Sequence, residues 1–350
     1  MSYTDEGGDG FGPALMAKAA KIEALAVKQR AAEYNNQGGT LLNAQEELEL
    51  YGSQTGGRTA PEVQPGSPHW SRLEEQYGWV SDVFKPFTEM PNPNAFTPLI
   101  RLADGVKAPL GMSEVDSRGK AALGDTALGG IGTAAITLGQ WRGDGASSFA
   151  NFSKPFSGIA HNQLAIADAL SQGMRANREI FVKTRHSISS VADTTITALQ
   201  NCGTYGFGAN ELVATVNVLA AVAAFAATAA SGGATLPVVF AAIAGAGSTT
   251  GALVSYAQAE AGEKEPPISG YTVNEVLQSM QAAVTVVRRD ISAAEETIAY
   301  ILQQNLAVVL NARKVTPAEV ADGKPQIVAP RPLLADLTAD NAKTHMEPKP

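Results

Sequence analysis

The chain has 350 residues, 45% of them hydrophobic and only 17% charged, with a formal net charge of −8. Such a chain can bury a sizeable core. Its acidic balance argues against nucleic acid as a partner, because binding to phosphates needs clustered cations. Aromatic residues make up only 6%, while glycine is abundant, with 34 residues. We therefore expect an all-α protein of elongated, closely packed antiparallel helices in a bundle.

The N-terminal sequence, MSYTDEGGDGFGP, is acidic and rich in glycine. It has neither the basic start nor the apolar stretch of a Sec or Tat signal peptide. A route out of the cytoplasm would therefore have to work without such a signal. The single cysteine, Cys202, cannot form an internal disulfide, and we expect it to be a small buried side chain.

Residues 1–94 are expected to form an N-terminal region of short helices. Its first 12 residues are expected to be disordered, and helices are predicted at 13–34, 41–51 and 68–87. Between the last two, residues 52–67 are rich in Gly, Pro, Ser and Thr, which is typical of a linker.

Residues 95–205 are predicted to contain a helical hairpin, preceded by a short helix at 95–112. Its first arm, residues 113–140, has an apolar stripe of Leu128, Ile131, Ala135 and Leu138, but also several glycines. Each interior glycine costs about 1 kcal/mol of helix stability relative to alanine. This arm must therefore be held by close packing against a neighbour. Apolar residues at three- and four-residue spacing predict a long second arm at 147–199, with a kink near Pro155.

Residues 206–262 are predicted to form an apolar helical hairpin, because no charged residue occurs from Leu212 to Ala259. Each half approaches the roughly twenty residues that span a bilayer. However, alanine, glycine and threonine dominate, and these residues drive membrane insertion weakly. A membrane hairpin and a core hairpin in water are both compatible with this composition.

Residues 263–313 are predicted to contain a long amphipathic helix starting at Val273. Its apolar positions alternate in steps of four and three, which is a coiled-coil heptad pattern: Val273, Leu277, Met280, Val284, Val287, Ile291, Ala294, Ile298 and Ile301. This stripe can pair with the helix at 147–199 or with another chain, and we favour the internal pairing. The tail, residues 314–350, is expected to be disordered.

Between the two arms of the first hairpin the sequence reads Trp141-Arg-Gly-Asp-Gly-Ala-Ser-Ser-Phe149. It resembles the signature of the WXG family, small helical-hairpin proteins (early-secreted-antigen-like) exported by type VII (ESX) secretion systems of Gram-positive actinobacteria. The matching positions are Trp141, Gly143, Gly145, Ala146 and Phe149. The resemblance covers about residues 113–200, and the apolar segment that follows is similar to that of long members of these secretion loci. Glycine suits the tight turn because it adopts positive φ, and the Trp ring can close the helix pair.

The family's export signal is Tyr-Xaa-Xaa-Xaa-Asp/Glu beyond a helical hairpin. Two segments of this chain match it, Tyr256 with Glu260 and Tyr271 with Glu275. On a helix, residues four apart share a face, so either pair can form one recognition patch. The sequence does not distinguish between them.

No catalytic constellation, metal-binding spacing or nucleotide fingerprint is found. We expect no enzyme activity, no cofactor and no metal. Asp168, Asp193 and Asp290 are predicted to lie on solvated helix faces, and Arg288 and Arg289 on the surface.

The resemblance implies a type VII secretion substrate, cytoplasmic before export and then secreted or associated with the cell envelope. It would be a non-enzymatic structural or membrane-active protein, with possible membrane contact through 212–259. Its partners would be the secretion machinery, a small WXG-type protein or a second copy of the chain, as a homo-oligomer. The alternatives are a cytoplasmic or phage-type structural helical protein, and the export handle of a toxin system.

Overall fold

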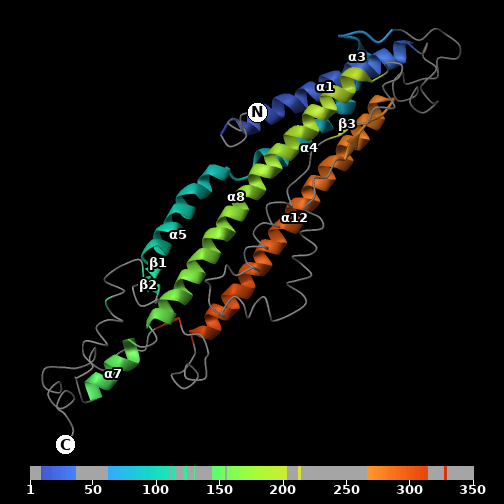
Figure 1. The fold of residues 1–350 in the computed structure, drawn as a ribbon. Helices are drawn as coiled ribbons and strands as arrows, with labels where there is room; N and C mark the ends of the chain where they lie inside the picture. The colour runs from blue at the N-terminus through green and yellow to red at the C-terminus, as the bar shows by residue number, and fades with distance from the viewer. Residues whose placement is uncertain are drawn as a thin grey trace, which may run out of the picture. The chain divides into compact units, whose positions relative to one another are not determined.

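The computed structural model is mostly helical in the part of the chain that it describes, which confirms the all-α prediction (Figure 1). The described residues are 9–36, 62–110, 112–115, 121–123, 130, 144–153, 156–202, 212–213, 266–313 and 327–328. The chain divides into two compact units. The first is built from Met1–Ala95, Arg178–Val222 and Gln258–Glu295, and the second from Phe96–Asn177, Ala223–Ala257 and Glu296–Pro350.

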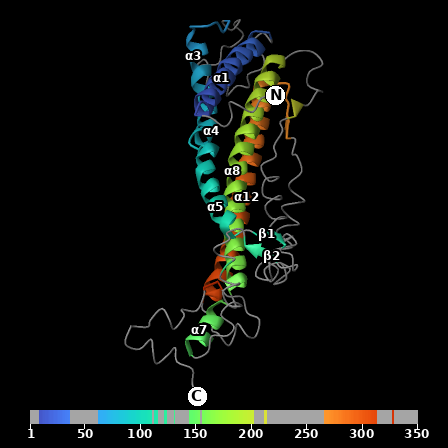
Figure 2. The same ribbon diagram turned by 60° about the vertical axis from the view of Figure 1, so that its left-hand side comes forward.

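The first unit begins with α1 (Phe11–Asn36), α3 (Pro68–Tyr77) and α4 (Trp79–Thr88). Helix α1 packs against both α3 and α4 (Figure 2). The single helix predicted at 68–87 is therefore two helices, separated at Gly78, a residue with low helix propensity. Ser67 caps α3 by accepting a hydrogen bond of 3.2 Å from Trp70 N, and Pro68 occupies the first turn, where its missing N–H is not needed. The helix predicted at 41–51 lies outside the described residues.

Two long helices contribute to both units, α8 (Phe156–Asn201) and α12 (Val273–Ala312). Both were predicted from their apolar stripes. The second arm predicted at 147–199 is divided, because α7 (Asp144–Ser153) ends before Pro155 and α8 begins just after it. A residue that precedes proline is disfavoured in helical conformation, so this sequence favours a helix end over the expected kink.

The core of the first unit joins the C-terminal part of α8 to the N-terminal part of α12. Ile188, Val191 and Leu199 of α8 are buried in the same apolar cluster as Met280 and Val287 of α12. In the second unit, Gly173 of α8 lies beside the side chain of Leu302 on α12. The apolar stripe of α12 is therefore covered, at these positions, by helices of the same chain.

In the second unit, α5 (Phe96–Leu110) follows the short 3-10 helix η1 (Pro93–Ala95). The predicted helix at 95–112 is thus confirmed. The prediction that a helix starts at residue 113 is wrong. Strands β1 (Met112–Val115) and β2 (Ala121–Leu123) form an antiparallel pair there, with Met112 opposite Leu123. Asp116, Ser117 and Gly119 lie between them in sequence, and these residue types favour turns over helices.

The predicted apolar hairpin begins differently from the expectation. The first two residues of its charge-free stretch, Leu212–Val213, form strand β3, which pairs antiparallel with β4 (Pro267–Ile268). The side chain of Ile268 belongs to the core of the first unit. Residues 214–259, on which the prediction of a membrane or core hairpin rests, lie outside the described residues. Among the helices that the structure does describe, none combines the length and the apolar character that a bilayer crossing requires.

Candidate functional site

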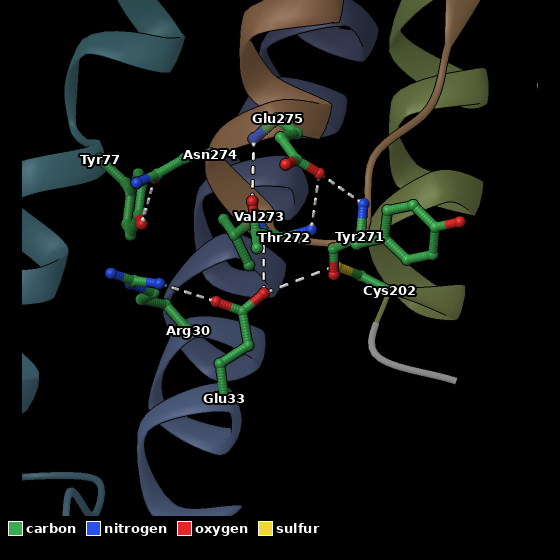
Figure 3. A network of polar contacts seen from close by, with 9 residues as sticks. All are labelled: Arg30, Glu33, Tyr77, Cys202, Tyr271, Thr272, Val273, Asn274 and Glu275. Carbon is green, nitrogen blue, oxygen red and sulfur yellow. Dashed lines mark hydrogen bonds and ion pairs between the residues drawn. The ribbon is translucent and has the colours of Figure 1, made fainter. Parts of the chain in front are cut away.

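The described part of the chain contains one of the two predicted export motifs, Tyr271 with Glu275, at the start of α12 (Figure 3). Thr272 is the last residue before the helix, and Val273 is its first residue. Side chains from α1, α3 and the end of α8 reach this segment. All of them belong to the first unit.

A reciprocal pair of hydrogen bonds starts α12. The Oε2 atom of Glu275 accepts hydrogen bonds from the backbone N–H groups of Tyr271, at 2.7 Å, and Thr272, at 3.2 Å. The hydroxyl oxygen of Thr272 accepts one from Glu275 N, at 3.3 Å. This is a capping box, which satisfies backbone donors that have no partner within the helix. Glu275 therefore has a local structural role in addition to any role in recognition.

Glu33 of α1 holds the same helix start from the other side. Its Oε1 atom accepts a hydrogen bond of 2.8 Å from Val273 N, and its Oε2 atom pairs with Arg30 at 2.9 Å. The side chain of Glu33 is only 10% exposed and that of Arg30 only 12%. A carboxylate is favourable at this position because the N-terminus of a helix carries partial positive charge.

Two further contacts fix the chain around Tyr271. The thiol of Cys202, just after α8, donates a hydrogen bond of 3.2 Å to the carbonyl oxygen of Tyr271. The hydroxyl of Tyr77 donates one of 3.0 Å to the side-chain oxygen of Asn274. Cys202 is buried, as predicted. Helices far apart in the sequence therefore position the backbone of this segment.

The ring of Tyr271 points away from these contacts and is 68% exposed (Figure 3). The expectation that Tyr271 and Glu275 share a helix face needs correction, because Tyr271 precedes the helix. The two residues are nevertheless adjacent, since the Glu275 carboxylate bonds to the backbone N–H of Tyr271. The result is an exposed aromatic ring next to an acidic group, on a backbone held by several contacts.

Of the other predicted site residues, Trp141, Gly143, Tyr256 and Glu260 lie outside the described residues. Gly145, Ala146 and Phe149 lie within α7. Gly145 is buried in the first turn of this helix, and Gly66 is the only glycine with positive φ in the described part of the chain. Conformational freedom at positive φ is therefore not the reason for a glycine at 145. Phe149 lies 6.2 Å from Phe152, between ring centroids.

The second unit holds a polar cluster that joins α5 to α8. Lys107 bonds Asp168 at 2.7 Å and Asp104 at 3.2 Å, and Asp104 also accepts hydrogen bonds from Ser171 and Arg175. The hydrogen bond from Ser171, followed by the one from Lys107, lowers the pKa of Asp104. Burial acts against the charged form of Lys107, but its bonds to Asp168 and Asp104 outweigh this and raise its pKa. The cluster has the character of a structural clamp between the helices.

A buried cation is found in the first unit at Arg185 of α8. Its side chain donates hydrogen bonds to the carbonyl oxygens of Met90, at 3.4 Å, and Pro91, at 3.3 Å. The guanidinium lies 4.7 Å from the centroid of the Phe11 ring. Burial lowers the pKa of Arg185. Arg185 thus holds the start of α1 and the segment after α4 against α8.

Sequence reasoning placed three aspartates on solvated faces, and this was wrong for Asp290, which is 2% exposed. Arg289 pairs with it at 3.3 Å. Asp168 is partly buried in its bond to Lys107, and Asp193 is 60% exposed and pairs with Lys18. Arg288 and Arg289 are exposed, as predicted.

The sequence analysis also did not identify Glu33 as a residue of the candidate site, because its partner, the backbone N–H of Val273, lies far away in the sequence. Thr272 and Glu275 were detectable, however, because Thr-Xaa-Xaa-Glu before an apolar stripe is the signature of a capping box.

No group of three or more potential metal-binding side chains occurs among the described residues. No family model matches the chain, and no similar protein was found among the curated proteins or the solved structures.

Proposed function

We propose that this chain is a non-enzymatic substrate of a type VII secretion system, and that Tyr271 and Glu275 form its export signal. The observation that carries the proposal is the exposure of the Tyr271 ring on a fixed backbone beside Glu275. A large aromatic ring that contributes little to the core is a natural recognition element. The Trp-Xaa-Gly sequence at Trp141 supports the same function through its resemblance to the WXG family.

The surrounding structure strengthens the choice of Tyr271. An anchor that is already ordered loses less conformational entropy when a receptor binds it. The capping box and the bonds from Glu33 and Cys202 provide such order. The proposed signal is therefore a preorganised surface made of one ring and one carboxylate.

We further propose that α8 and α12 pair antiparallel within each unit, as the sequence predicts for a bundle. The thiol of Cys202 contacts Tyr271 in the first unit, and Gly173 lies beside Leu302 in the second. In the first unit, the end of α8 thus lies at the start of α12, and Ile188 and Met280, which are further from these ends, belong to the same buried cluster. This is the arrangement of an antiparallel pair.

The proposed role after export is that of an envelope-associated structural or membrane-active protein. The support is the charge-free sequence from Leu212 to Ala259. In this proposal the helical bundle covers these residues in the cytoplasm and exposes them to a bilayer or to sister subunits after export. Flotation with liposomes of anionic phospholipid tests the membrane branch. A chain that stays in the dense fraction as a stable monomer would contradict it.

Three variants separate signalling from capping. Tyr271→Ala removes the exposed ring and, as a surface change, should alter stability by less than about 0.5 kcal/mol. Glu275→Gln removes the charge but keeps an oxygen that can accept the capping bonds, since glutamine also serves in a capping box. Thr272→Ala removes the hydroxyl cap and should cost about 1 kcal/mol, while leaving the ring and the carboxylate in place.

The expected result is that Tyr271→Ala and Glu275→Gln block secretion into the culture filtrate with near-native melting temperatures. Thr272→Ala should be less stable and still secreted. Secretion of Tyr271→Ala at the wild-type level would refute the assignment, as would a loss of secretion that follows stability across the three variants. Tyr256→Ala in the same assay tests the other motif.

A further inference from the structure

Gly270, the residue before Tyr271, lies so close to the first turn of α12 that a side chain does not fit there. A Cβ atom at this position would lie 2.5 Å from Cβ of Glu275, 2.7 Å from the backbone nitrogen of Val276 and 3.0 Å from the carbonyl carbon of Glu275. Two of these three atoms belong to the helix backbone. The N–H of Val276 bonds to the carbonyl oxygen of Thr272 at 3.2 Å, so the helix cannot yield without losing a hydrogen bond of its first turn.

Glycine at position 270 is required for space and not for an unusual backbone conformation. Gly66 is the only glycine with positive φ in the described part of the chain, so Gly270 has a φ that other residues also adopt. At Gly173, by comparison, the nearest atom to a Cβ is 3.2 Å away and belongs to the flexible side chain of Leu302. Gly270 is therefore a position at which two stretches of backbone approach each other closely.

Residues 269–272 connect two buried side chains and are held at both ends. Ile268 of β4 and Val273 of α12 are both 0% exposed and belong to the same core. Between them, the carbonyl oxygen of Ser269 accepts a hydrogen bond of 2.9 Å from the hydroxyl of Ser279, which shares its proton with carbonyl oxygens of α12. The connection therefore lies along the first two turns of α12.

This course of the chain places Tyr271 beside Glu275. The N–H of Tyr271 lies 2.7 Å from Oε2 of Glu275, and the ring points away from these contacts (Figure 3). Glu275 also contributes the Cβ atom that lies nearest to Gly270. Moving Gly270 away from the helix therefore also moves Tyr271 away from the carboxylate.

The residue before the tyrosine also distinguishes the two candidate motifs. Tyr271 follows a glycine and precedes the capping residue Thr272, whereas Tyr256 follows a serine and precedes an alanine. The motif at Tyr256 therefore lacks the residue types that provide the close approach and the hydroxyl cap at Tyr271.

We propose that Gly270 is a positioning residue of the export signal, because it lets the Tyr271 ring lie beside the Glu275 carboxylate. The inference rests on the proposed function and adds a requirement to it. The working motif of this chain is Gly-Tyr-Thr-Xaa-Xaa-Glu, residues 270–275. A side chain at position 270 displaces residues 269–271 from α12, so a receptor meets the same ring and carboxylate in a less ordered arrangement.

Hydrogen–deuterium exchange in the full chain, followed by mass spectrometry, tests the positioning without reference to export. Glu275 accepts hydrogen bonds from the amides of Tyr271 and Thr272, and Gly270→Ala should accelerate their exchange by about tenfold or more. Ser269→Ala is the matched control and should leave it unchanged, because Ser269 joins this network through its backbone carbonyl. Unchanged exchange in Gly270→Ala would overturn the inference. Faster exchange throughout α8 would also count against it, because the effect would then be a general loss of structure.

Export of the same variants separates positioning from stability. Gly270→Ala should reduce the amount of chain in the culture filtrate by about tenfold, since the apparent affinity for a receptor falls with the ordered fraction of the signal. Thr272→Ala, which is less stable but keeps Gly270, and Ser269→Ala should both be exported. Export of Gly270→Ala at the level of Thr272→Ala would refute the positioning role. If the wild type is retained as well, the proposed function fails, and the exchange rates alone decide whether Gly270 positions Tyr271.

Discussion

Glu33 of α1 accepts a hydrogen bond of 2.8 Å from the backbone N–H of Val273, the first residue of α12. The two residues are 240 positions apart in the chain. One partly buried carboxylate thereby joins the end of α1 to the start of α12. The order of the Tyr271 segment depends on this contact, together with the capping box.

Glu33→Ala should lower the free energy of unfolding by about 1–3 kcal/mol, because the N–H of Val273 loses its acceptor. Glu33→Gln should cost less, since the amide oxygen can still accept from Val273. Urea unfolding followed by circular dichroism measures both. Glu296→Ala, a change at an exposed position of α12, is the control and should stay within about 0.5 kcal/mol of the wild type. Equal effects of Glu33→Ala and Glu296→Ala would show that the contact is unimportant.

The clamp between α5 and α8 should make stability depend on pH. The pKa of Asp104 is lowered in the folded protein by the hydrogen bonds from Ser171 and Lys107. The ionised Asp104 carboxylate therefore stabilises the fold above the ordinary aspartate pKa of about 3.9. This stabilisation is lost as the pH falls through the lower pKa that Asp104 has in the folded protein.

Asp104→Asn should be less stable than the wild type at neutral pH, and the difference should shrink below about pH 4. Thermal unfolding of both proteins across this range gives the comparison. A constant difference at all pH values would mean that the charge of Asp104 is not what stabilises the clamp.

Two glycines of α8 differ in their surroundings and should respond differently to alanine. No atom lies within 4 Å of a Cβ at Gly158, whereas a Cβ at Gly173 would lie 3.2 Å from Cδ2 of Leu302. Gly158→Ala should raise stability by about 1 kcal/mol through helix propensity alone. Gly173→Ala should gain less, because Leu302 must move, and Gly173→Val should be destabilising.

A double-mutant cycle isolates this helix contact. In a Leu302→Ala background, Gly173→Ala should gain as much stability as Gly158→Ala does in the wild type. Equal gains of Gly173→Ala in both backgrounds would contradict the close approach of α8 and α12 at this position.

Even a conservative substitution of Arg185 should destabilise the protein. Arg185→Lys keeps the charge, but an ammonium group cannot span the carbonyls of Met90 and Pro91 while stacking on Phe11, so we expect a loss of about 1–3 kcal/mol. Phe11→Leu removes only the ring and should cost less. Arg101→Lys, at an exposed position, should have little effect. Chemical denaturation ranks the three variants, and a loss no larger for Arg185→Lys than for Arg101→Lys would exclude the proposed role.

The sequence predicted the helices whose signal is local and repeated. The regular stripe from Val273 to Ile301 predicted α12, and spacing of the same kind predicted α8. It missed features that depend on distant partners, such as Glu33 at the start of α12 and the burial of Asp290. Neither residue type nor spacing reveals a partner that lies 240 residues away.

Other errors were local. Turn-forming residues after Val115 indicated a reversal where a helix was expected, and Gly78 and Pro155 mark the ends of helices that were predicted to continue. At the candidate site, the motif of Tyr271 and Glu275 was recognised, but its capping function was not. The exposure of the Tyr271 ring required the three-dimensional structure.

The most direct test of the proposed function is export itself. The tagged chain is expressed in an actinobacterium with a functional type VII system, with and without the ATPase of that system, and culture filtrate, envelope and cytosol are blotted. We predict that the chain leaves the cytosol only when the ATPase is present, and that Tyr271→Ala abolishes this export. Retention in the cytosol of both strains would contradict the proposed secretion function and favour an internal structural helical protein.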